Sequence, residues 1–195
     1  AQEVAATWQE YVDYQDIRVL EIGMDLAYFD HLKRLVENLE HPLLESLVTL
    51  TIDCYNVITV ERALSLKKPG SFMKQLLSDA GTLSAREVIQ CVKQGNLISW
   101  FQQVNPLPYD VELTRYEEQM RAGRVSAETV EYLEHVIKYR ILEQASFETD
   151  GPLPLARYLF GKELEVKNLR LVLTGLDNQL PIDKIKERMR PIYGQ

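Results

Sequence analysis

The chain has 195 residues, enough for one large domain or two small ones with a buried core. Its net charge of -7, from 29 acidic and 22 basic residues, argues against nucleic acid as a partner, because phosphate binding requires a concentrated basic surface. The hydrophobic fraction of 46% is typical of a globular protein, and no stretch approaches the roughly 20 consecutive apolar residues that cross a bilayer. We therefore expect no transmembrane segment.

The two cysteines and the first residues indicate the expected compartment. Cys54 and Cys91 lie far apart in apolar, helical stretches and lack a CxxC partner, which predicts reduced, buried thiols in a cytosolic protein and no zinc site. The sequence begins at Ala1 without a basic start or a long apolar run, so no signal peptide is predicted. A first residue other than Met indicates processing or a longer parent protein.

Apolar residues recur at helical spacing along nearly the whole chain. The first helical unit ends at His41, because the residue before a proline is disfavoured in the helical region, and Pro42 is well placed to begin the next helix. Ser84 with Glu87 three positions later predicts a capping box. No segment alternates as a strand does, so the predicted fold class is all-α. Helices are expected at 9–39, 43–65, 71–78, 84–93, 111–121, 126–147, 153–174 and 182–190, with a loop at 175–179.

Residues 161–174 mix polar and apolar positions more closely than a surface helix does. Leu164, Leu169, Leu171 and Leu173 are expected to cluster on one side of this helix. The interleaved polar residues must then approach the core, where they need hydrogen-bond or ion-pair partners. A related pattern of residues occurs earlier, at 50–62.

Three correspondences, in the same order in both halves, predict an internal repeat. They divide the chain into two related helical modules, residues 1–105 and 106–195. In this alignment His31 and His135 occupy equivalent positions. The matched segments are 28–31 with 132–135 at an offset of 104, 53–57 with 165–169 at an offset of 112, and 83–88 with 180–185 at an offset of 97.

The repeat points to a cluster of polar residues at the centre of each module. Asp53 with Asn56, and Glu165 with Asn168, are three positions apart, so each pair faces one side of its helix. Two interpretations remain open: a satisfied buried network that determines how helices cross, or an interface to a partner helix. The candidate network residues are Asp53, Asn56, Arg62, Glu165, Asn168 and Arg170.

The sequence offers little support for an enzyme. It has no glycine-rich phosphate loop, no nucleophile elbow and no Glu-x-x-His pair of the kind that holds di-iron centres. The three histidines, His31, His41 and His135, lack an orienting constellation, and a structural or surface role is expected for His31 and His135. We therefore predict no catalytic residues, no cofactor and no metal.

Several segments resemble the C subunit of the A-type and bacterial V-type ATPases, which is named the d subunit in the eukaryotic vacuolar enzyme. The resemblance is strongest at an acidic-x-x-Asn-apolar-Arg helix followed by a Gly/Asn/Leu loop and a short basic helix. The loop departs from the family pattern, because Leu176 and Gln179 stand where the family more often has Lys and Gly. The segments that resemble the family are 162–175, 178–181, 185–190, 25–32, 52–62 and 81–83.

This resemblance implies a helical chain that forms part of a funnel-like, non-catalytic rotor adaptor. Such an adaptor couples the central shaft of the ATPase sector to the membrane proteolipid ring, for ATP-driven proton or sodium transport or for ATP synthesis in reverse. It implies a peripheral position at the cytoplasmic face of the membrane. The family chain is longer, with three modules, so this chain resembles its C-terminal two-thirds, and the Ala1 start fits such a truncation.

Two other functions stay open beside the adaptor. One is a helical interaction or regulatory module with another partner. The other is an enzyme whose active site the residue pattern does not show, which a convergent set of titratable residues in one pocket would favour.

Overall fold

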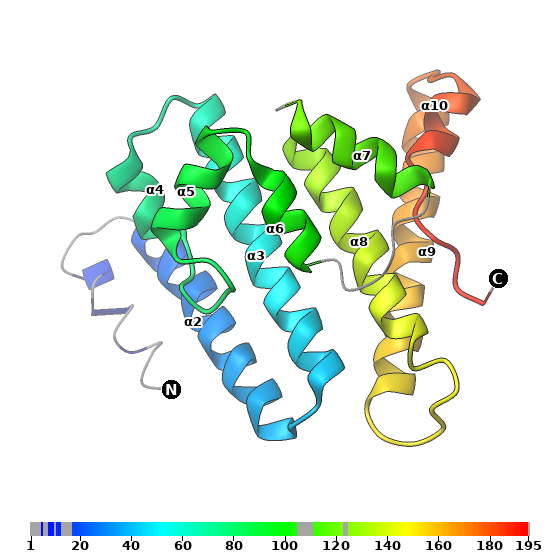
Figure 1. Cartoon of the computed structure of the whole chain (residues 1–195), viewed down its shortest axis with the longest axis horizontal. Helices are drawn as coiled ribbons and strands as arrows, with labels where there is room; N and C mark the ends of the chain where they lie inside the picture. The colour runs from blue at the N-terminus through cyan, green and yellow to red at the C-terminus, as the bar shows by residue number, and fades with distance from the viewer. Residues whose placement is uncertain are drawn as a thin grey trace.

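A computed structural model of the chain describes residues 5, 8–9, 11–12, 17–104, 111–122 and 125–194. All regular structure in these residues is helical and none is strand, which confirms the predicted all-α class (Figure 1). In chain order the helices are α2 (Ile17–Leu39), α3 (Pro42–Ser65), α4 (Gly70–Leu76), α5 (Ala85–Lys93), α6 (Leu97–Val104), α7 (Val111–Arg121), α8 (Ala127–Glu143), α9 (Leu153–Asp177) and α10 (Ile182–Glu187).

Four long helices lie side by side in the order α2, α3, α8, α9 and form one layer (Figure 1). The short helices α4 and α5 pack on α3, α6 packs on α7, and α10 folds back onto α9. Helices α2 and α9 are the two edges of the layer, and α3 and α8 are its interior.

Helix α3 is the centre of the core. Ile52 faces a cluster shared with α2, which includes Phe29, whereas Val57 belongs to a larger cluster shared with α8, which includes Ile137. Because both sides of α3 are covered, its apolar residues are not confined to a single stripe. By length and composition α3 is the one helix in the described ranges that could span a membrane. Its apolar composition is explained by its burial between α2 and α8, because the core helix of a globular domain is apolar for the same reason.

The sequence predicted several helix boundaries correctly. Pro42 is the first residue of α3, and the capping box is present: Ser84 accepts a hydrogen bond from the Glu87 backbone N–H, and the Glu87 carboxylate accepts one from the Ser84 backbone N–H. These signals succeed because caps and prolines act on the backbone within a few residues.

The predicted end of the α9 helix is wrong. The helix does not stop at Thr174 but continues through Gly175 to Asp177, so the expected loop at 175–179 is mostly helical. Gly175 serves close packing rather than termination, because a Cβ at this position would lie 2.7 Å from the Ile185 side chain of α10. Helix α8 likewise ends at Glu143, four residues before the predicted limit, and α10 ends at Glu187.

The division into two modules stays a prediction. Its boundary, between residues 105 and 106, lies outside the described residues. The core is continuous across that division, since buried side chains of α3 and α8 belong to one cluster.

We expect Ile137→Ala to lower the free energy of unfolding by about 2–5 kcal/mol, because this fully buried side chain fills the seam between α3 and α8. Chemical denaturation monitored by circular dichroism measures the change. Leu66→Ala, at an exposed position after α3, is the matched control and should change stability by about 0.5 kcal/mol or less. Equal losses in both variants would contradict a continuous core at this seam.

Candidate functional site

Two buried asparagines each hold a non-helical segment of the backbone by a pair of hydrogen bonds. On α3, the Asn56 amide donates to the Ser78 carbonyl at 2.8 Å and its carbonyl oxygen accepts from the Ser78 N–H at 3.0 Å. On α9, the Asn168 amide donates to the Arg190 carbonyl at 3.0 Å and its oxygen accepts from the Arg190 N–H at 2.8 Å. Each pair spans 22 residues. We call these contacts the asparagine clamps.

The clamp on α3 lies beside a buried carboxylate. Asp53 accepts hydrogen bonds from the Thr82 N–H at 2.8 Å and from the Thr82 hydroxyl at 2.6 Å. Gly81 is required there, because a Cβ on this residue would lie 2.2 Å from an Asp53 oxygen. Burial raises the pKa of Asp53, while the hydrogen bonds from Thr82 act in the opposite direction. Asp53 and Asn56 together thus fasten the loop between α4 and α5 to α3.

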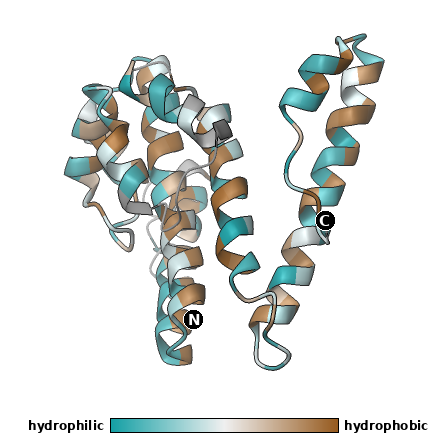
Figure 2. Ribbon diagram, turned by 45° about the vertical axis from the view of Figure 1, so that its right-hand side comes forward, coloured by the Kyte–Doolittle hydropathy of each residue, from teal (hydrophilic) through white to brown (hydrophobic). Residues whose placement is uncertain are grey.

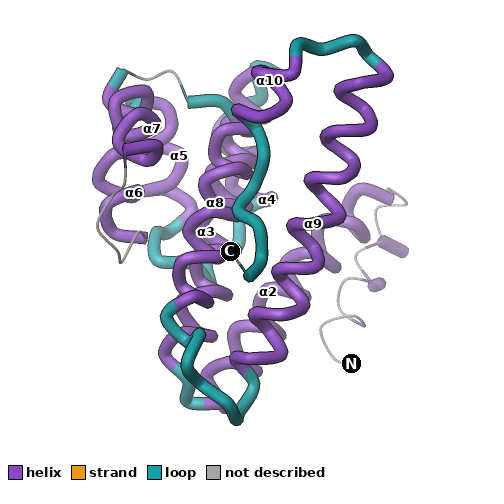
Figure 3. The backbone as a smooth tube through the Cα atoms, turned by 90° about the vertical axis from the view of Figure 1, so that its right-hand side faces the viewer, coloured by secondary structure: helices purple, strands orange, loops and turns teal. Residues whose placement is uncertain are grey.

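The clamp on α9 holds the C-terminal segment (residues 188–194), which runs back between α8 and α9 (Figure 3). The Tyr139 hydroxyl of α8 donates to the Ile192 carbonyl at 3.1 Å. On the other side, Tyr193 packs against Gly161 of α9, where a Cβ would lie 2.6 Å from the tyrosine ring. The segment therefore fills the space between two long helices and takes hydrogen bonds from both.

A buried histidine lies beside this clamp. Nζ of Lys167 lies 2.7 Å from Nε2 of His135, and Nε of Arg190 lies 3.5 Å from Nδ1 of the same ring. Burial, together with the charges of Lys167, Arg190 and Lys138, lowers the pKa of His135 to about 3, so the ring is neutral. His31 is exposed on α2, so the structure does not place the two histidines in equivalent environments.

The six predicted polar residues lie on two helices, three on α3 and three on α9. Asp53 and Asn56 are nearly inaccessible to solvent on α3, and Asn168 is buried on α9. Each of these three binds backbone groups of a segment outside the long helices. The buried part of the prediction thus consists of two separate sites, one on each helix.

The other three predicted residues lie at the surface. Arg62 forms an ion pair with Glu131 of α8, Glu165 pairs with Lys162 at 2.8 Å, and Arg170 is exposed. Exposed ion pairs of this kind contribute about 1 kcal/mol or less, because water and salt screen the charges. Glu165 is therefore not the buried counterpart of Asp53.

Helix α9 is apolar on two sides, which corrects the expected clustering of its leucines. Leu164 is 0% exposed, whereas Leu169 is 62% and Leu173 is 67% exposed. Positions five or nine residues apart lie about half a turn apart on a helix, so these side chains cannot share a face. One apolar face packs inward, and the side chains of the other are exposed among the described residues.

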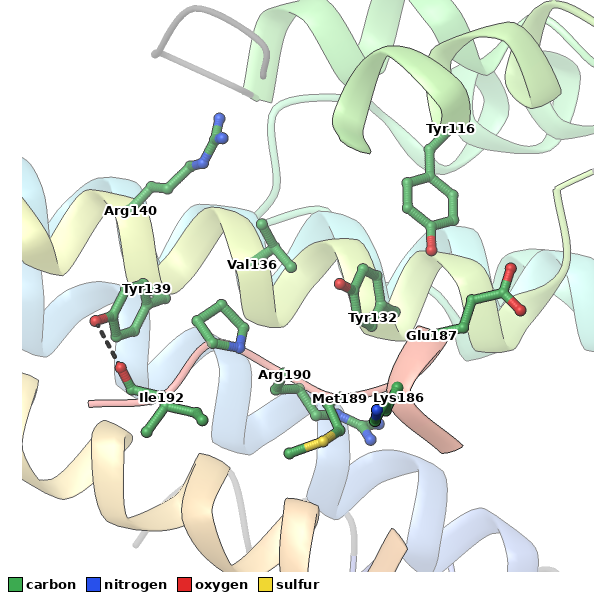
Figure 4. A pocket seen from close by; sticks show the side chains of 11 residues that line it. Tyr116, Tyr132, Val136, Tyr139, Arg140, Lys186, Glu187, Met189, Arg190 and Ile192 are labelled. Atoms are coloured by element: carbon green, nitrogen blue, oxygen red, sulfur yellow. Dashed lines mark hydrogen bonds between the residues drawn. The ribbon is translucent and has the colours of Figure 1, made fainter. Parts of the chain in front are cut away.

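A cavity of about 510 Å³ lies between α7, α8 and the C-terminal segment (Figure 4). Tyr116 and Tyr132 line it from the two helices, and Arg140, Lys186 and Arg190 add cationic groups. No group of three or more His, Cys, Asp or Glu side chains suited to a metal ion occurs in the described ranges.

Sequence patterns did not identify the partners of the two clamps. Nothing in the spacing connects Asn168 with Arg190 or Asn56 with Ser78, because these contacts depend on where a loop returns in space. Gly161 was the one available signal, since a glycine inside a helical pattern often marks a close approach of another segment.

The sequence matches a known protein family over nearly its whole length. The model of the family described as ATP synthase (C/AC39) subunit matches residues 2–188. The C subunit of the V-type sodium ATPase of Enterococcus hirae is 30% identical over 177 residues, covering 89% of this chain and 52% of that protein. The C subunit of the A-type ATP synthase of Pyrococcus horikoshii is 23% identical, covering 88% of this chain and 47% of that protein.

A third relative, from the A-type ATP synthase of Thermococcus onnurineus and again its C subunit, is 27% identical over 153 residues, covering 76% of this chain and 39% of that protein. The chain thus spans about half the length of these relatives, or less, rather than the expected two-thirds. No solved structure is significantly similar to it.

We expect Asn168→Ala to reduce the free energy of unfolding by about 1–3 kcal/mol, because the Arg190 N–H and carbonyl lose both partners. Proteolysis of the C-terminal segment should also become faster. Glu165→Ala, one turn away in an exposed ion pair, is the control and should cost about 0.5 kcal/mol or less. If the two variants behave alike, the clamp does not hold the segment.

The low pKa of His135 predicts a loss of stability in acid. The folded state keeps the ring neutral down to a pKa of about 3, whereas the unfolded chain protonates near 6.5. This contribution is present above about pH 6.5 and is lost as the pH falls toward 3, by up to about 1.4 kcal/mol per pH unit. Urea unfolding between pH 4 and 7 measures it. His135→Gln should flatten the slope and the exposed His31→Gln should not; an unchanged slope in His135→Gln would refute the assignment.

Proposed function

Because the chain belongs to the ATP synthase (C/AC39) subunit family, we propose that it acts as a non-catalytic rotor adaptor of a V-type or A-type ATPase. In this role it couples the central shaft of the ATPase sector to the membrane proteolipid ring, so that ATP hydrolysis drives proton or sodium transport, or ion flow drives ATP synthesis. The family match over residues 2–188 carries the proposal, and the relatives, which are C subunits of a sodium ATPase and of ATP synthases, support it.

The architecture suits a part that transmits torque. Long helices packed side by side resist bending, and a soft connection between them would store elastic energy rather than pass it on. The asparagine clamps restrict motion of the non-helical segments. One clamp fastens the loop after α4 to α3, and the other fastens the segment after α10 to α9. We assign this stiffening role, and not a role in chemistry, to the buried polar residues Asp53, Asn56 and Asn168.

The proposed partners are the central-shaft subunits and the proteolipid ring, bound at the cytoplasmic face of the membrane. The chain would be a peripheral component there, recruited through protein contacts. Its net charge of -7 favours partners with basic surfaces and disfavours nucleic acid.

Binding to purified shaft subunits and to detergent-solubilised ring tests the adaptor role. The full chain should retain at least one of these partners, and recovery of neither would favour a helical module with a different partner.

The stiffening role is tested separately, in an ATPase assembled with this chain in the adaptor position. Asn168→Ala should lower the number of ions transported per ATP hydrolysed while leaving hydrolysis itself active, because the loosened segment transmits less torque. Glu165→Ala serves as the matched control. Unchanged coupling in Asn168→Ala would contradict the stiffening role without affecting the binding result.

A further inference from the structure

The cavity beside the C-terminal segment continues into a second cavity along α8. The second cavity has a volume of about 690 Å³ and shares Tyr116, Tyr132, Glu187 and Arg190 with the first. The two form one groove that lies between α7, α8 and the stretch of chain made by α10 and the C-terminal segment (Figure 4). We call it the C-terminal groove.

The length of the groove follows from the α8 residues that line it. They run from Glu128 to Arg140, a distance of about 18 Å at a rise of about 1.5 Å per residue. The combined volume of the two cavities exceeds the roughly 300–1,000 Å³ of small-molecule sites. A peptide in extended conformation advances about 3.3 Å per residue, so about five residues span this length. The dimensions therefore favour a peptide over a compact ligand.

The C-terminal groove is positive although the chain as a whole has a net charge of -7. Hydrophilic residues dominate α10, which forms part of its wall (Figure 2). Among the described residues that line the groove, the acidic ones are Glu128, Glu131 and Glu187, of which Glu131 forms an ion pair with Arg62, outside the groove. The cationic ones outnumber them, and they are Arg140, Lys184, Lys186, Arg188 and Arg190.

The buried histidine beside the groove is a further sign of this positive charge. Burial first, and then the charges of Lys167, Arg190 and Lys138, lower the pKa of His135 to about 3. The Arg190 side chain, which lines the groove, thus contacts a ring that carries no charge. An anionic group in the groove would gain from this arrangement, because the ring does not neutralise the guanidinium.

Two tyrosines add aromatic surface to the groove. Tyr116 of α7 and Tyr132 of α8 are half-buried, and their ring centroids lie 5.5 Å apart. Figure 4 shows both rings at the cavity, one from each helix. Tyrosine rings offer a large contact area at little cost in conformational entropy, which suits them to binding peptide side chains.

We propose that the C-terminal groove binds an acidic peptide segment of a partner protein in extended conformation. Carboxylates of the peptide pair with Lys186 and Arg188, and an apolar or aromatic side chain packs on Tyr132. The negative charges elsewhere on the chain weaken this attraction little, because salt at physiological concentration screens charges beyond about 8 Å. The proposal goes beyond the rotor role and does not depend on it.

Fluorescence anisotropy of the full chain with a labelled peptide tests the proposal. The probe is a peptide of about eight residues, with glutamates around one central phenylalanine, long enough to fill the groove. It should bind saturably, and more weakly as salt rises, whereas the same peptide with lysines in place of the glutamates should not bind. Lys186→Glu with Arg188→Glu should weaken binding at least about tenfold, because two attractive charges become repulsive. Both side chains are exposed, so the fold should be retained, which circular dichroism checks.

The matched control is Lys74→Glu with Lys93→Glu, which changes the net charge equally at exposed positions on α4 and α5, outside the groove. This pair should bind the peptide as wild type does. Equal weakening in both pairs of substitutions would show a response to net charge alone and would overturn the proposal.

Methyl NMR of the methionines locates the peptide. Met189 lines the groove and Met24 lies on α2, so the peptide should shift the methyl signal of Met189 and leave that of Met24 unchanged. Absence of saturable binding, or binding without a shift of Met189, would overturn the proposal. A shift of Met189 with adenosine triphosphate but not with the peptide would assign the groove to a small polyanion and would overturn it equally.

Discussion

The structure depends on the burial of α3 from two sides. A helix covered by α2 on one side and by α8 on the other leaves little room for the loop that returns to it after α4. That loop carries backbone N–H and carbonyl groups away from water, and each unpaired group would cost about 1–3 kcal/mol. Asn56 and Asp53 satisfy these groups from the helix itself, which lets a non-helical segment lie against the core.

Helices α3 and α9 share a construction but differ in their surroundings. Each places an asparagine where it binds a backbone segment 22 residues later. The neighbouring carboxylates diverge, because Asp53 binds Thr82 in the core whereas Glu165 pairs with Lys162 at the surface. The asparagine therefore makes the same contact on both helices. The acidic residue three positions before it binds a different partner on each helix, because one is buried and the other lies near the surface.

The family match indicates the role of the chain, whereas its exposed apolar side chains indicate where other parts can pack on it. The family match indicates a component of a rotary ATPase, where the chain would act through its surfaces and its stiffness. Exposed leucines on α9, among them Leu169 and Leu173, show that this helix is suited to further packing. An apolar helix surface of this kind is consistent with a part whose role is assembly.

The sequence by itself determined the fold class and most helix starts, because helical periodicity, prolines and the Ser84 capping box act over a few residues. It also drew attention to Asn56 and Asn168, since an amide near a core helix requires partners. Only the tertiary structure decided which segments the two asparagines bind, that Glu165 lies at the surface, and that Leu164 and Leu169 face opposite sides. These outcomes depend on which helices become neighbours, and that is settled by packing between residues far apart in the chain.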